Sequence, residues 1–111
     1  MNYSDQLVDS AERAGNIVCM GLDPSAQTLR GEGGSFFERA TGSFSRLLGM
    51  MKEQDLEVAA FKPNIGYWQA EDHPRDGDFG GSRALSFILD LIDELFPHTP
   101  VILDSKRVDI Q

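Results

Sequence analysis

Charged residues directly follow three separate apolar segments of the sequence. They are Asp23, Lys62 and Asp104, and each stands against the last apolar residue of its segment. If the segments are parallel β-strands, their carboxyl ends meet at one edge of a sheet, where β/α proteins gather their functional side chains. A solvated loop residue explains one such charge, but its repetition at all three ends favours a shared site.

The last of these ends carries four charges within six residues: Asp104, Lys106, Arg107 and Asp109. Side chains alternate along a strand, so Asp104 and Lys106 point to the same side, where Lys62 from the neighbouring strand can join them. In such a Lys-Asp-Lys cluster each charge offsets the desolvation of the next. Asp109 lies beyond the strand and would have to act across an interface or from a following helix. The alternative interpretation is a solvated strand-to-helix turn.

Alternating helices and strands would position these charges. Capping residues and apolar periodicity predict the helices, and short apolar runs predict strands that a parallel sheet buries on both faces. The predicted elements are a helix that begins at Ser4 and ends at Gly15, a strand over 17–22, a helix from the capping box of Ser35 and Glu38 to Met51, a strand over 57–64, a helix from Ser82 as N-cap to Phe96, and a strand over 101–105. Strand starts about forty residues apart indicate parallel strands joined by right-handed helical crossovers.

The composition limits the cellular context and the partners. The chain has 111 residues, enough for one small domain, and a formal net charge of −8. This charge argues against nucleic acid and an anionic membrane surface as partners, because both bind clustered Lys and Arg. It does not exclude an anionic small molecule as a ligand. The single cysteine, Cys19, lies in an apolar run, so we expect a buried thiol in a reducing compartment. With no signal peptide and no long apolar span, the expected location is cytoplasmic.

Three motifs carry a resemblance to a known family: CMGLDPS (19–25), AFKPNIGYW (60–68) and LDSKRVDI (103–110). The third resembles the Asp-x-Lys-x-x-Asp-Ile signature of orotidine 5′-phosphate decarboxylases. The first two are similar to the first- and second-strand motifs of the bacterial type 2 branch of that family. Tyr67 and Trp68, at the end of the second motif, are interpreted as packing residues. Asp-x-Lys-x-x-Asp alone occurs in related sugar-phosphate enzymes, but the three motifs in this order are specific.

The resemblance implies conversion of orotidine 5′-phosphate to UMP and carbon dioxide in de novo pyrimidine biosynthesis, with no cofactor and no metal. By motif, Asp23 would bind ribose hydroxyls, and Lys62 would hold the ribose and order the neighbouring acid. Asp104 would sit against the substrate carboxylate. Lys106 would stabilise the carbanion that develops at C6 and then protonate it, since an ammonium fixed in advance needs no reorganisation during the reaction.

Two further roles follow from the same resemblance. Asp109 would enter the active site of the other subunit, which implies a homodimer, and Ile110 would line the pocket near the pyrimidine. Val108 departs from the family, which generally has Gly or Ala there, so a branched side chain stands in a crowded turn near the dimer interface.

The family's fold is an α/β fold, a (β/α)8 TIM barrel of the ribulose-phosphate-binding type, and the sequence supplies about three of its strands. Residues 1–111 are then expected to be a single partial domain without the phosphate-binding segments, inactive alone and prone to self-association through unpaired strand edges. Two alternatives stay open. One is a metal-dependent sugar-phosphate lyase or aldolase of the same superfamily, and the other is a non-catalytic module that binds a partner or itself.

Overall fold

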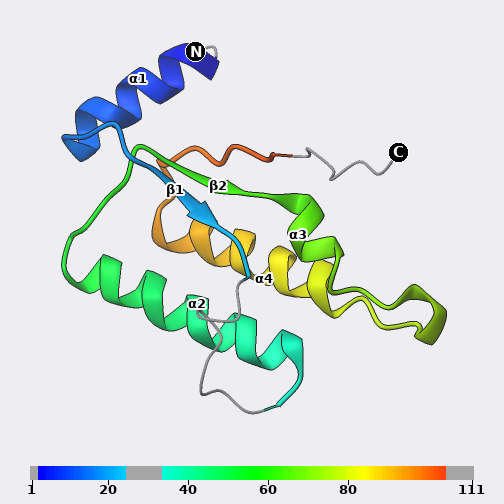
Figure 1. Ribbon diagram of the computed structural model, residues 1–111. Coiled ribbons are helices and arrows are strands. Elements are labelled where there is room, and N and C mark those ends of the chain that lie inside the picture. The colour runs from blue at the N-terminus through cyan, green and yellow to red at the C-terminus, as the bar shows by residue number, and fades with distance from the viewer. Residues whose placement is uncertain (1–2, 25–33, 105–111) are drawn as a thin grey trace.

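A computed structural model describes residues 3–24 and 34–104 of the chain. In chain order the elements are α1 (Tyr3–Ala14), β1 (Cys19–Leu22), α2 (Phe36–Glu53), β2 (Ala60–Pro63), α3 (Ile65–Gln69), the 3-10 turn η1 (Pro74–Asp76) and α4 (Gly80–Leu95). β1 and β2 pair in parallel, as predicted. Helices α2 and α4 lie side by side on one face of the strands, and α1 lies on the other side (Figure 1). Helix α3 and the turn η1 were not anticipated from the sequence.

Of the third predicted strand, 101–105, Ser105 lies outside the described residues, and the rest forms two isolated bridges, one with β2 and one with the residue that follows it. Val101 pairs in parallel with Phe61, and Asp104 pairs in parallel with Asn64. The backbone of Phe61 both donates to and accepts from this segment of chain. The segment from Val101 to Asp104 therefore runs along β2 on the side away from β1, in the order that parallel crossovers require.

The capping box of α2 is present as predicted. The hydroxyl oxygen of Ser35 accepts from the backbone N–H of Glu38 (3.1 Å), and the Glu38 carboxylate accepts from the backbone N–H of Ser35 (3.2 Å). The helix then buries Phe44 and Leu48 beneath the strands. This helix runs from Phe36 to Glu53, close to the predicted range.

The predicted N-cap of α4 is wrong. The helix begins at Gly80, so Ser82 lies within its first turn. Two carboxylates from the preceding loop accept the first N–H groups instead: Asp78 from Gly80 (2.8 Å) and Asp72 from Ser82 (2.9 Å). Asp72 also accepts from the Ser82 hydroxyl. Acids at this position are favourable because they neutralise the positive end of the helix dipole.

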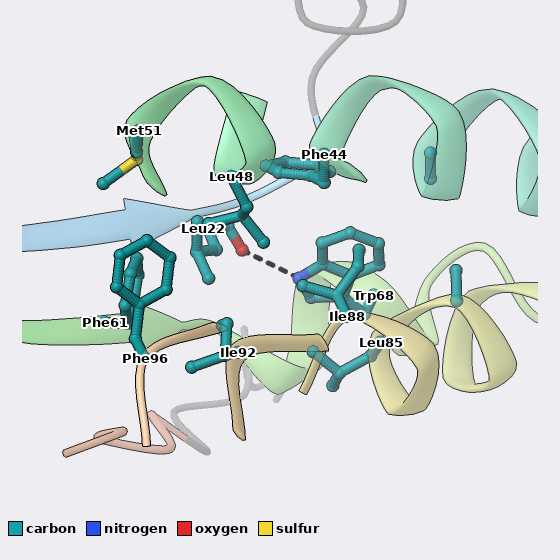
Figure 2. Close-up of a cluster of buried hydrophobic side chains, with 12 residues drawn as sticks. Leu22, Phe44, Leu48, Met51, Phe61, Trp68, Leu85, Ile88, Ile92 and Phe96 are labelled. Atoms are coloured by element: carbon teal, nitrogen blue, oxygen red, sulfur yellow. Dashed lines mark hydrogen bonds between the residues drawn. The ribbon is translucent and has the colours of Figure 1, made fainter. Parts of the chain in front are cut away.

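The core fills the space between the strands and the pair α2–α4 (Figure 2). Its fully buried members include Leu22 from β1, Phe61 from β2 and Trp68 from α3. The helices contribute Leu48, Ile88 and Ile92, which are also fully buried. The apolar stripes predicted for the two long helices are thus the ones that meet the sheet.

The expectation that β1 is buried on both faces is wrong for this chain. Leu22 is buried beneath the helices, but Cys19 and Gly21 are exposed on the opposite face, and Ile17 before the strand is 88% exposed. The expected burial of the Cys19 thiol fails for the same reason. We call this uncovered surface the open face. Between α1 and the open face lies an apolar hollow of about 300 Å³, lined by Leu7, Val8, Ala11, Ile17, Cys19, Ala59, Ala60 and Ile102.

Helix α1 is attached at the amino ends of the strands. Gly15, with φ of +74°, follows its last turn, in agreement with the predicted stop. Arg13 forms an ion pair with Asp9 and donates to the carbonyl oxygen of His98 (3.0 Å). The hydrogen bond to His98 joins α1 to the loop between α4 and the segment that begins at Val101.

Candidate active site

The strand register places three polar residues in one row, two of them predicted from the sequence. Because Leu22 stands opposite Pro63 in the parallel pair, Asp23 comes next to Asn64. Asn64 in turn bridges to Asp104. Asp23, Asn64 and Asp104 therefore cross three neighbouring segments at the carboxyl ends of the strands, as predicted for the two acids.

Lys62 lies two residues before Asn64 on β2 and so points to the same face. Its ammonium Nζ is 3.9 Å from Oδ2 of Asp104. The Lys62 side chain is 48% exposed, and that of Asp104 is 24% exposed. The structure thus brings together Lys62 and Asp104 as predicted, at the rim of the open face, where a ligand can reach the ammonium.

Asp23 is held by the backbone of the neighbouring strand. Its Oδ1 accepts from the N–H of Asn64 at 3.2 Å. This contact could not be predicted, because a backbone N–H leaves no signature in the sequence. The result is one carboxylate paired with an ammonium and another held by a peptide group, on two segments that flank β2.

Asn64 also starts α3 and fixes the end of β2. Its side-chain oxygen accepts from the N–H of Gly66 (3.0 Å), which makes it the N-cap of the helix. The next N–H, of Ile65, donates to the carbonyl oxygen of Asp104 (2.9 Å). The Asn64 N–H therefore binds the side chain of Asp23, and the Ile65 N–H binds the main chain of Asp104. Asparagine after Pro63 was the available sequence signal for this turn.

Three predicted site residues and one departure lie outside the described residues. They are Lys106, Asp109, Ile110 and Val108. The described part of the site consequently comprises Asp23, Lys62 and Asp104, all at the strand ends where the sequence places them.

Within residues 3–24 and 34–104, no helix is long and apolar enough to cross a membrane. In the same residues, no group of three or more His, Cys, Asp or Glu side chains is placed to hold a metal ion.

The sequence of the chain is similar to those of known proteins. No family profile matches the chain. The orotidine 5′-phosphate decarboxylase of Ralstonia pickettii is 36% identical over 117 residues, covering 99% of this chain and 36% of that protein. The chain is homologous to orotidine 5′-phosphate decarboxylases. The decarboxylase of Ralstonia nicotianae matches the same share of the chain at 35% identity.

A solved structure extends the relation to the fold. The UMP synthase of Leishmania donovani superposes with a TM-score of 0.60 and 30% sequence identity, covering 99% of this chain and 20% of that one. The α/β arrangement of the chain is that of the N-terminal units of a (β/α)8 barrel, as predicted. The chain spans about a third of the length of the decarboxylases that it matches.

Proposed function

We propose that this chain supplies the first part of the active site of an orotidine 5′-phosphate decarboxylase. The observation that carries the proposal is the approach of Lys62 to Asp104, 3.9 Å apart at the carboxyl ends of adjacent segments, in a chain homologous to these enzymes. Asp23 stands in the same row and would bind ribose hydroxyls. The remaining barrel units, including those that hold the phosphate, would come from further polypeptide.

The proposed reaction needs only side chains of this chain at the reacting carbon. Asp104 would lie against the substrate carboxylate, with Lys62 holding it in place. The bond between C6 and the carboxylate breaks, carbon dioxide leaves, and the electron pair stays on C6. Lys106, two residues beyond Asp104, would stabilise that pair by its positive charge and then donate a proton to it, giving UMP. No cofactor or metal takes part in this scheme.

We further propose that the active protein is a cytoplasmic homodimer. Asp109, five positions after Asp104 in the sequence, would enter the site of the other subunit, beside Lys106. Ile110 would line the pyrimidine pocket. Val108, next to Asp109 in the sequence, would then stand near the contact between subunits, where a branched side chain is least expected.

The test compares the chain alone with the chain joined in frame to the remaining two thirds of the Ralstonia pickettii decarboxylase. We expect turnover of orotidine 5′-phosphate in the fusion and none in the chain alone. Lys106→Ala in the fusion should abolish turnover while binding of a substrate analogue largely survives. Lys52→Ala, which removes an exposed cation from the last turn of α2, is the matched control and should leave turnover unchanged.

Three results would contradict the proposal. Turnover at the original rate in Lys106→Ala would show that Lys106 does not stabilise and protonate the carbanion at C6. Loss of activity on treatment with EDTA would instead favour the metal-dependent sugar-phosphate lyase. A fusion that folds and binds no substrate analogue would favour the non-catalytic module.

A further inference from the structure

The backbone N–H groups of β2 alternate between its two neighbours. Ala60 shares the carbonyl oxygen of Val18, just before β1, with the N–H of Ala59 (3.4 and 2.9 Å), and Phe61 donates to the carbonyl of Pro100 on the other side (3.0 Å). By this alternation the N–H of Asn64 faces β1, where a regular parallel ladder would offer it the carbonyl oxygen of Leu22. It donates to the side chain of Asp23 at 3.2 Å.

The carbonyl oxygen of Leu22 has another donor. The indole N–H of Trp68 reaches it at 2.8 Å, the contact drawn as a dashed line in Figure 2. Both Trp68 and Leu22 are fully buried, so this carbonyl needs a protein donor. The indole thus occupies one of the two lone pairs of the carbonyl oxygen toward which the ladder would direct the Asn64 N–H.

Trp68 is held in this position from two sides. Phe44 packs against its ring with centroids 5.5 Å apart, and Phe36 meets it edge-on at 6.1 Å. Behind it, a Cβ at Gly81 would overlap the carbonyl oxygen of Trp68, so the glycine lets α3 and α4 approach closely. The indole N–H therefore has little freedom to leave Leu22.

We propose that Trp68 and Asn64 are positioning residues for Asp23: the buried indole occupies the Leu22 carbonyl, and this directs the Asn64 N–H to the Asp23 carboxylate. The ligand-binding role of Asp23 rests on the proposed function, but the arrangement itself does not. A packing residue in the core thereby sets the orientation of an acid at the active-site rim. The side-chain cap that Asn64 gives to Gly66 holds the N–H in the required direction.

The test follows the amide proton of Asn64 by NMR while the pH is changed through the range in which carboxyl groups ionise. An amide that donates to a carboxylate shifts when that carboxylate ionises. We expect the Asn64 resonance to move with the same midpoint as the Asp23 side-chain carbon, and to lose this movement in Asp23→Asn. If the Asn64 resonance of the unaltered protein does not shift when Asp23 ionises, the proposal is overturned.

The role of the indole is tested with a matched pair of core variants. Trp68→Phe keeps an aromatic ring but removes the N–H, so Asn64 can return to the Leu22 carbonyl and most of its response to Asp23 is lost. Phe44→Leu disturbs the same cluster, keeps the indole, and should keep the response. Equal loss in both variants, or none in Trp68→Phe, overturns the proposal. If Trp68→Phe does not fold, the Asp23→Asn comparison still decides the Asn64 contact.

A kinetic readout separates this inference from the proposed function. In the active fusion, Trp68→Phe should raise KM for orotidine 5′-phosphate more than it lowers kcat, because ribose binding is disturbed while Lys106 is intact. Absence of turnover in the unaltered fusion would contradict the proposed function and leave the NMR result standing. An unchanged KM beside a lost NMR response would overturn the link from Trp68 to substrate binding.

Discussion

Lys62 faces Asp104 across 3.9 Å while about half of its side chain stays exposed to solvent. Ion pairs this exposed contribute little to folding, because water screens them and two long side chains lose freedom. The apolar neighbours of Lys62 in β2 are buried, so the strand does not depend on a lysine for its stability. The charge at this position is therefore better explained by binding than by folding.

Replacing Lys62 by alanine should separate stability from activity. We expect the free energy of unfolding to change by less than about 1 kcal/mol, measured by chemical denaturation. Turnover in the fusion should fall by about 10²-fold or more, as for other fixed electrostatic donors. A free energy of unfolding close to that of the unaltered protein, together with near-normal turnover, would show that Lys62 is a solvated rim residue. A large loss of stability would assign it to the fold instead.

The acids and the lysine could be predicted because their charges stand directly after apolar runs. The contacts that orient them could not. Asn64 acts on Asp23 through a backbone N–H, and Trp68 acts through an indole that reaches a residue 46 positions earlier. The sequence therefore indicates which side chains face the site but not which groups hold them.

At the scale of the elements, local signals succeeded and distant ones failed. The capping box of α2 spans four residues, Ser35 to Glu38, and was predicted correctly from the sequence. The start of α4 depends on Asp72, whose carboxylate accepts a hydrogen bond from the backbone N–H of Ser82, ten positions later in the chain. Because a nearby serine satisfies the usual pattern, the sequence predicted the wrong cap.

Asp72 gives the prediction for this scale. Asp72→Ala should lower the free energy of unfolding by about 1 kcal/mol or more, since it leaves the Ser82 N–H and hydroxyl without their acceptor. Asp76→Ala removes an exposed acid from η1 and is the matched control, with a change within about 0.5 kcal/mol. Thermal denaturation of both variants measures the difference. Equal Tm values for the two would mean that solvent caps α4 as well as Asp72 does.

At the scale of the whole molecule, the open face is the main departure from the sequence prediction. An apolar run such as 17–22 is typical of a strand covered on both sides, as in a complete barrel. In this chain α2 and α4 cover one side, and the hollow under α1 leaves the other partly apolar and accessible. The apolar pattern of 17–22 correctly indicated a barrel strand. The sequence of one strand does not reveal how many other strands and helices the chain provides to cover it.

The open face leads us to expect that the isolated chain self-associates at micromolar concentration. Sedimentation analysis should show species larger than a monomer. Ile17→Lys places a charge on the open face and should shift the distribution toward the monomer. Met50→Lys, on α2, makes the same change in net charge at a residue 55% exposed and should have little effect. A well-dispersed monomer of the unaltered chain with cooperative unfolding would refute this expectation.

The exposure of Cys19 has a practical consequence. The chain contains one cysteine, and its thiol lies on the open face beside the apolar hollow. Any polypeptide that completes the barrel must cover this face, and a covered thiol reacts more slowly with an alkylating reagent than an accessible one. The rate of alkylation at Cys19 is thus a built-in reporter of barrel closure, and it needs no substrate, no label and no engineered residue.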